Sequence, residues 1–288
     1  MRLFSAVLLL LLFSSFAISE PLYWLAKKGN KELMILGSIH VGNESMYPLP
    51  TEIMVFLEHS DGLILETDTR KTNDIKYPVN QDAVKDIVTG TQLAKLRMIS
   101  KELNVAEATL MNLPPWNAAL AIQMGKLNLL GYKPSQGVDH KLLYKAALQE
   151  TPIIGLEPLQ FQIDLIANLP NDGEELLFAA LDEYHQTEKM TGCLIDSWKA
   201  GDSENLLEFA ATSEFSEDFE RLFITDRNKD WANKLNGTVF LGDDSGQYLV
   251  VVGTLHLVGK GNLMNELESR GFSIEKRSNS ESVKCEFL

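Results

Sequence analysis

The sequence predicts an α/β fold with a largely parallel or mixed central sheet that is covered by helices. Short apolar runs alternate along the chain with longer helical patterns, which is typical of this class. The run at residues 248–252 is continuously apolar and suits a strand that is buried on both faces. Residues 171–236 show helical patterns and no strand-like run, so we expect a helical insertion there.

Each expected element follows from its length and apolar pattern. Strands are expected where four or so apolar residues stand together, and helices where the apolar spacing is longer and periodic. The strand-like runs are residues 22–26, 33–36, 62–65, 152–156, 238–241, 248–252 and 272–274. The helical patterns fill residues 51–59, 81–100, 101–111, 115–130, 139–149 and 262–270. Pro115 suits a helix start, because proline is tolerated in the first turn.

The first 19 residues have the form of a secretory signal peptide. Arg2 precedes an apolar run of eight residues at 6–13, and Ala17 and Ser19 occupy the −3 and −1 positions of a cleavage site. A membrane anchor needs roughly 20 apolar residues, so this run is too short for one. We expect an exported protein, periplasmic or secreted, with one α/β domain at residues 20–288 and no stable membrane insertion after cleavage.

Composition excludes several classes of protein. The chain of 288 residues is 45% hydrophobic and 23% charged, which is ordinary for a globular domain and excludes wholesale disorder. Its 26 Lys and Arg against 40 Asp and Glu give a formal charge of −14, so no basic footprint for nucleic acid exists. Two cysteines exclude a disulfide-dense scaffold. Cys193 and Cys285 either pair in an oxidising compartment or remain thiols, and the sequence leaves both open.

One short pattern occurs twice, near opposite ends of the chain. Residues 34–42 and 251–259 each carry an apolar run, a glycine, a hydroxyl residue, an apolar residue and a histidine, which is His40 or His256. The glycine permits a tight exit from a strand, which places the histidine just past its carboxyl end. Ligands of open α/β sheets bind outside these ends. If the two strands are parallel neighbours, both imidazoles share one crevice; otherwise each is a structural loop histidine.

Three carboxylates occupy related positions. Glu66 directly follows the run at 62–65, and Glu157 directly follows the run at 152–156. Each is either a cap for nearby backbone or a residue of the site. Asp139 opens a predicted helix, where it is either the N-cap or part of the site.

These residue types form a mixed nitrogen and oxygen ligand set. The candidate ligands His40, His256, Glu66 and Asp139 suit Zn²⁺, Mn²⁺ or Co²⁺ without selecting one. A bound metal ion lowers the pKa of water toward ~7, and a carboxylate that is not a ligand can act as general base. Without metal, the same cluster can do acid–base chemistry through histidine.

Arg227 adds a cation in the helical stretch before the last strands. A guanidinium near a metal site can hold a substrate carboxylate or a developing oxyanion, and the alternative is a surface salt bridge. The other histidines, His59, His140 and His185, carry no pattern and are expected to be structural.

The stretch from residue 171 to residue 220 is strongly acidic, with 14 Asp or Glu against two Lys. A solvated helical layer explains this composition, and a docking surface for a basic partner is the alternative.

Taken together, these motifs resemble the TraB/PrgY/GumN family, which is related to the TIKI proteases that cleave Wnt proteins. Each motif alone is weak, but their order and spacing match over nearly all of the mature chain. The motifs lie at residues 22–24, 36–42, 47–50, 64–68, 136–139, 155–157, 227–228 with Trp231, 252–257 and 271–272.

The resemblance implies a fold like that of the erythromycin esterase and ChaN group, with paired Gly-x-x-His motifs and a glutamate at the site. In the TIKI branch these elements belong to a metal-dependent protease. Carried over, they fall on His40, Glu66 and His256, with Arg227 and Asn228 as supporting candidates. Other branches differ: PrgY inhibits pheromone signalling, and GumN is associated with exopolysaccharide gene clusters. The signal peptide and soluble form look most like the GumN-type bacterial members.

We therefore expect an exported metal-dependent hydrolase that acts on a peptide or another small extracytoplasmic substrate. The alternative is a non-catalytic periplasmic binding or signal-inhibiting protein for a peptide or polysaccharide intermediate. A third hypothesis is an interaction module that works through the acidic helices. The sequence selects neither the metal, nor the substrate, nor the oligomeric state.

Overall fold

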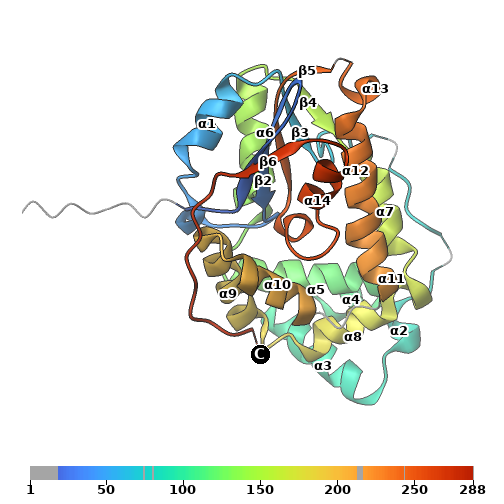
Figure 1. Ribbon diagram of the computed structural model, residues 1–288. Helices are drawn as coiled ribbons and strands as arrows, with labels where there is room; N and C mark the ends of the chain where they lie inside the picture. The colour runs from blue at the N-terminus through green and yellow to red at the C-terminus, as the bar shows by residue number, and fades with distance from the viewer. Residues whose placement is uncertain (1–18, 74, 80, 213–216, 243, 288) are drawn as a thin grey trace, which may run out of the picture.

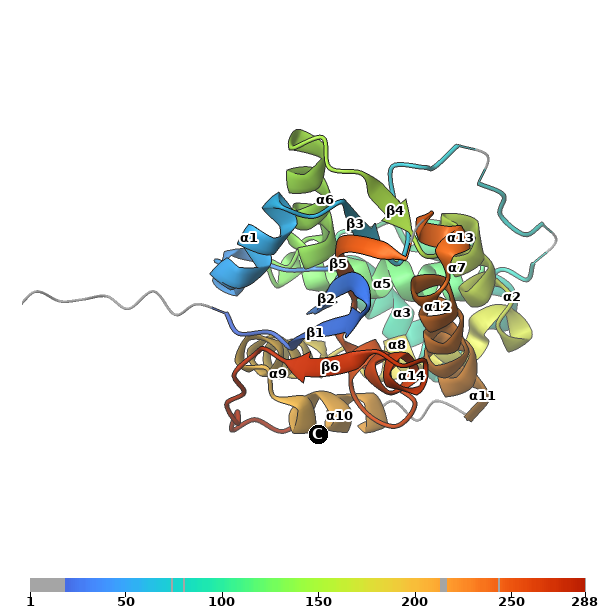
Figure 2. The same ribbon diagram turned by 45° about the horizontal axis from the view of Figure 1, so that its top comes forward.

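The computed structural model describes residues 19–73, 75–79, 81–212, 217–242 and 244–287. Six strands of this described chain form one mixed sheet in the order β4-β3-β5-β2-β1-β6, which Figure 2 shows from β6 below to β4 above. Their bounds are β1 Tyr23–Lys28, β2 Asn30–Ser38, β3 Gly62–Leu65, β4 Ile153–Gly155, β5 Ser245–Gly253 and β6 Ser273–Lys276. Strands β2, β5, β3 and β4 are parallel neighbours, and β1 runs antiparallel between β2 and β6. The predicted α/β class is confirmed.

Side chains alternate between the two faces of the sheet along each strand. Because β2 carries apolar side chains on both faces, helices cover both faces of the sheet. Met34 and Leu36 of β2 pack into a cluster with α1 (Thr51–Glu58) and α6 (Val138–Leu148). Leu33 and Ile35 pack into a cluster with α12 (Asp226–Asn236) and α14 (Leu263–Ser269). Figure 1 shows α1 and α6 on one side and α12 and α14 on the other. A third apolar cluster joins the helices α2–α5, which lie between residues 84 and 129, to α8 (Glu174–Asp182) below the sheet.

The helix bounds agree with most of the predicted ranges. They are α1 Thr51–Glu58, α2 Val84–Ile87, α3 Gly90–Glu102, α4 Glu107–Met111, α5 Pro115–Leu129, α6 Val138–Leu148, α7 Leu159–Ala167, α8 Glu174–Asp182, α9 Thr187–Ala200, α10 Ser203–Thr212, α11 Glu217–Glu220, α12 Asp226–Asn236, α13 Thr238–Leu241 and α14 Leu263–Ser269. A π-helical turn, η4 (Arg221–Thr225), directly precedes α12.

Two local predictions are wrong. Residues 238–241 form the short helix α13 and not a strand. Both edges of β5, the next strand along the chain, are already paired with β2 and β3, so the sheet has no place beside it for this segment. The pattern at residues 81–100 forms two helices, because Val88 and Thr89 between them have extended backbone.

Residues 171–236 hold helices and no strand at the positions that the structure describes there. These helices contribute to the main core: Trp198 of α9 and Leu206 of α10 are fully buried in the cluster that includes β2. Cys193 of α9 and Cys285 form a disulfide with their Cα atoms 5.7 Å apart, within the usual range for this bond. The bond connects the C-terminal segment to α9.

The predicted signal peptide, residues 1–19, lies outside the described residues except for Ser19. The N–H of Ser19 donates to the carbonyl of Pro48, and the N–H of Glu20 donates to the carbonyl of Lys199. Over the described ranges that begin at Ser19, we find no helix with the length and apolarity that a membrane span requires.

Candidate functional site

Four parallel strands end at one edge of the sheet and bring the predicted residues together there. The register pairs Ser38 of β2 with Gly253 of β5, and Leu65 of β3 with Val251 of β5. Leu65 is also paired with Gly155 of β4. His40, Glu66, Glu157 and His256 follow these four strands within three residues. The sequence predicts that His40 and His256 share one crevice if their two strands are parallel neighbours. These strands, β2 and β5, are parallel neighbours.

Arg227 is the centre of a buried cluster beside this edge. Its Nη2 donates to Glu66 Oε2 at 2.5 Å and to Glu157 Oε1 at 2.6 Å, and its Nε donates to Glu157 Oε2 at 3.3 Å. Its Nη1 donates to the carbonyl of Phe223 at 3.0 Å and to His256 Nε2 at 3.2 Å. All five N–H groups of the guanidinium are thus used within the protein. In this arrangement Arg227 has no donor left for a substrate oxyanion, which was one of its predicted roles.

Glu66 is held on both oxygens. Besides Arg227, Oε2 accepts from Gln162, and Oε1 accepts from the backbone N–H of Gly253 at 2.7 Å. Burial alone would raise the pKa of Glu66, but the basic side chains around it and the Gly253 hydrogen bond lower the pKa to about 2. The carboxylate is therefore ionised at neutral pH.

His256 is buried and neutral. Its Nε2 accepts from Arg227, so Nδ1 carries the proton and donates to Asn228 Oδ1 at 2.8 Å. Its ring packs on Trp231 with the centroids 4.4 Å apart. Burial lowers the pKa of His256 to about 3. Asn228, a candidate from the family resemblance, thus fixes the tautomer of this imidazole.

His40 has a different environment. Its side chain is 65% exposed, and Nδ1 lies 2.9 Å from Asp139 Oδ2. Asp139 Oδ1 accepts from the hydroxyl of Ser38 at 2.7 Å. The Asp139 carboxylate raises the pKa of His40 above its ordinary value of 6.5. The N-cap interpretation of Asp139 is wrong, because Gly137 is the N-cap of α6 and Asp139 orients His40 instead.

Close packing of the backbone sets the position of His40. A Cβ atom on Gly137 would lie 2.2 Å from the carbonyl oxygen of His40, so only glycine fits there. The N–H of Val138 donates to the carbonyl of Ile39, and Trp198 Nε1 donates to the carbonyl of Gly37. The end of β2 is therefore held by α9, and the loop after it is held by α6.

Two residues of the cluster were not predicted as site residues, although Trp231 was noted as part of a family motif. Gln162 of α7 donates to Glu66 Oε2 at 3.1 Å and to Glu157 Oε1 at 3.0 Å, and Trp231 Nε1 donates to Glu157 Oε2 at 3.1 Å. Helix α7 was not among the predicted helices. Pro158 at its N-cap could have indicated a helix start.

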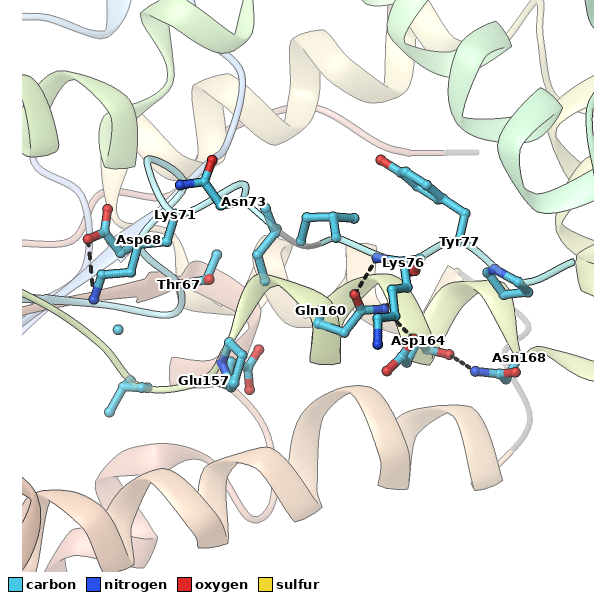
Figure 3. Close-up of a pocket in the computed structure, with 16 residues that line it drawn as sticks. Thr67, Asp68, Lys71, Asn73, Lys76, Tyr77, Glu157, Gln160, Asp164 and Asn168 are labelled. Atoms are coloured by element: carbon cyan, nitrogen blue, oxygen red, sulfur yellow. Dashed lines mark hydrogen bonds and ion pairs between the residues drawn. The ribbon is translucent and has the colours of Figure 1, made fainter.

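A groove of about 930 Å³ lies beside the cluster. Its walls are the loop after β3 and the turn from β4 into α7, and Glu157 of the cluster reaches its lining. In Figure 3, Thr67 and Asp68 lie toward one end of the groove, and Tyr77 and Asn168 lie toward the other. The groove places a potential ligand next to the carboxyl ends of β3 and β4.

The donor types fit a first-row metal ion, but they are bonded to other groups. His256 Nε2 lies 3.9 Å from Glu66 Oε1, and both side chains also bond Arg227. His40 pairs with Asp139. Within the described ranges, no group of three or more His, Cys, Asp or Glu is arranged to hold an ion. The Arg227 guanidinium is the cation that these acceptors bind in this structure.

Comparisons with known proteins support the resemblance. The model of the TraB/PrgY/gumN family matches residues 22–276. The uncharacterized protein YbaP of Escherichia coli strain K12 is 31% identical over 237 residues, which are 82% of this chain and 87% of YbaP, and YbaP of Shigella flexneri matches equally. No solved structure matches the chain. With the family model spanning the sheet, the candidate site and the groove, the chain belongs to the TraB/PrgY/gumN family.

Proposed function

We propose that this protein is an exported hydrolase of the peptidase type that acts at the carboxyl edge of the sheet, with a divalent metal ion as cofactor. One observation carries the proposal: strand ends far apart in the sequence bring two histidines and two buried glutamates to one edge of the sheet, and Glu157 of this set lines a groove. Strongly perturbed ionisable groups in such a position are typical of catalytic sites.

Each side chain of the site has a separate role in the proposed hydrolysis. His40 is exposed, and its Nδ1 is held by Asp139, which leaves Nε2 as the nitrogen that can bind a metal ion. Glu66 stays ionised and can orient an attacking water as general base. Glu157 keeps Arg227 in place, and the groove orients an extended substrate against the strand ends.

His40, His256 and Glu66 would hold the metal ion, and Asp139 would act behind His40 as the partner of its second nitrogen. Imidazole nitrogen and carboxylate oxygen are the donors that Zn²⁺, Mn²⁺ and Co²⁺ share. The metal would activate water and polarise the carbonyl group of the substrate.

Export is supported by two observations from different parts of the chain. The N-terminal residues have signal-peptide form, and Cys193 is bonded to Cys285. Disulfides persist in the periplasm and outside cells but are rare in the cytosol. A peptide or other small extracytoplasmic molecule is the substrate class that this location offers.

The test is hydrolysis of a peptide library by the purified chain without residues 1–19, with chelator and with added Mn²⁺, Co²⁺ or Zn²⁺. We expect cleavage with metal, and a loss of about 10²-fold or more in His40→Ala and His256→Ala, because each variant removes a proposed metal ligand. His59→Ala, a histidine bonded to Val55 on α1, is the matched control. No cleavage under any condition, or equal cleavage by all variants, contradicts the proposal.

The groove also favours a second candidate function, capture of a peptide or polysaccharide intermediate without turnover. All N–H groups of the Arg227 guanidinium donate hydrogen bonds within the protein, which favours a rigid binding site over a catalytic one. Calorimetric binding of a ligand that mass spectrometry recovers unchanged would identify this function.

A further inference from the structure

The Arg227 cluster contains more negative than positive charge. Glu66 and Glu157 are both nearly buried, with side chains 6% and 4% exposed, and they share a single guanidinium. The adjacent His256 supplies no charge, because its Nε2 accepts a hydrogen bond from Arg227. A buried carboxylate without a compensating cation is costly, so this pocket is built to contain positive charge.

The acceptors of Arg227 overlap with the donors of the proposed metal ion. Glu66 Oε2 and His256 Nε2 both bond the guanidinium, at 2.5 Å and 3.2 Å. A metal ion that binds the same lone pairs would stand within a few ångströms of the guanidinium charge. Because like charges at this separation repel strongly in a buried site, the two cations exclude one another.

Other contacts would still hold Arg227 if it no longer bonded Glu66 and His256. Glu157 bonds it through Oε1 and Oε2, and the guanidinium carbon lies 4.5 Å from the ring centroid of Trp231. Neither Glu157 nor Trp231 is among the proposed metal ligands. The arginine can therefore give up Glu66 and His256 and still keep an ion pair and an aromatic neighbour.

We propose that Arg227 competes with the metal ion for Glu66 and His256. The metal ion binds these two side chains only when the guanidinium moves toward Glu157 and Trp231. This inference rests on the metal-dependent function proposed above. It makes Arg227 the residue that sets the metal affinity of the site, and it does not require Arg227 to touch the substrate.

The experiment is calorimetric titration of the metal-free protein with Co²⁺ and Mn²⁺, together with the absorption spectrum of bound Co²⁺. We expect Arg227→Gln to bind about tenfold more tightly than the unchanged protein, because the competing charge is removed. Arg227→Lys keeps the charge and should bind like the unchanged protein. Arg70→Gln is the matched control, since Arg70 pairs with Asp68 outside the cluster. His256→Ala added to Arg227→Gln should abolish the gain.

A second measurement covers the case in which Arg227→Gln does not fold. In the unchanged protein with ¹⁵N-labelled arginine, added Zn²⁺ should shift the Nε–H resonance of Arg227 and leave that of Arg70 in place. Equal affinities of the unchanged protein and Arg227→Gln, or an unmoved Arg227 resonance at saturating metal, overturn the inference and leave the metal-dependent function standing. If neither protein binds metal, both the inference and the metal cofactor are wrong, and hydrolysis in chelator decides separately whether the protein is a hydrolase.

Discussion

The two histidines of the centre have opposite environments although the same short sequence pattern carries both. His256 is buried against Trp231, and burial keeps its imidazole neutral. His40 is exposed, and the adjacent Asp139 carboxylate favours its protonated form. Desolvation and a neighbouring charge thus shift the same group in opposite directions. At the scale of the residue, the sequence pattern determines where the two imidazoles lie. The neighbouring side chains determine the protonation state of each imidazole.

Asp139→Asn should lower the pKa of His40 toward 6.5, because a neutral amide no longer favours the imidazolium. The folded-state pKa of His40 lies above its unfolded value. The pairing therefore stabilises the fold below pH 6.5, and this contribution is lost as the pH rises through the folded-state pKa. NMR titration of the chelator-treated protein measures this change, with His59 as the internal reference. A His40 pKa that does not move in the variant would contradict the assigned role of Asp139.

Arg227→Gln should lower the free energy of unfolding by about 3–5 kcal/mol, because it leaves two buried carboxylates without their cation. Urea denaturation followed by circular dichroism gives the value. Arg97→Gln removes an ion pair in which both side chains are exposed, Arg97 at 59% and Glu107 at 40%, and should change the free energy by about 1 kcal/mol or less. Equal losses in both variants would show that the cluster contributes no more than a surface ion pair.

At the scale of elements, the end of β2 and the loop after it depend on two helices that are distant in sequence. Helix α6 approaches so closely at Gly137 that no side chain fits, and α9 supplies the Trp198 hydrogen bond to Gly37. The same α9 carries Cys193, which is bonded to Cys285. A change in either helix should therefore reach His40 through backbone contacts.

Gly137→Ala should destabilise the protein and displace His40, since the added methyl group meets the His40 carbonyl at 2.2 Å. Gly192→Ala is the matched control, because a Cβ there has nothing within 4 Å inside α9. The control should stabilise the protein by about 0.5–1 kcal/mol, since alanine is the better helix former. Thermal melts compare the two variants, and a Gly137→Ala protein as stable as the original would contradict the packing.

Replacing both cysteines, Cys193→Ser with Cys285→Ser, should cost about 2–4 kcal/mol, mainly because the unfolded chain gains freedom. The bond closes 92 residues of chain. Urea unfolding of the original protein with and without reductant should show the same difference, whereas reductant should leave the double variant unchanged. If reduction does not alter the original protein, the bond is not formed in it.

At the scale of the whole molecule, the acidic helices are part of the core and not an appendage. Leu177 and Leu181 of α8 pack with α3 and α5, and Trp198 and Leu206 are buried against the sheet. Their charged faces remain a candidate docking surface for a basic partner. The packing shows that the fold itself needs these helices.

Deletion of residues 171–220 should therefore leave a chain without cooperative unfolding, because the deletion opens two apolar clusters at once. Circular dichroism melts test this. The double variant Glu175→Gln with Asp196→Asn changes two exposed residues of α8 and α9 and should keep the fold. A stable deletion variant would show that the segment is an independent insertion.

Most of the sheet could be predicted from the sequence, because buried parallel strands are continuous apolar runs such as 248–252. The edge residues Glu66 and Glu157 could be predicted as well, since each directly follows such a run. Helix α7 and Gln162 could not be located by apolar pattern. Residues 238–241 look like a strand locally, but the neighbours of β5 exclude them from the sheet.

The sequence by itself determined the α/β class, the strands and the side chains that follow each strand, because apolar period and turn residues are local properties. Only the tertiary structure decided that β2 and β5 are neighbours, that Asp139 faces His40 and not its own helix end, and that Arg227 bonds Glu66, Glu157 and His256 at once. Strand order and the rotation of a helix against a sheet depend on contacts between distant residues, which no local pattern encodes.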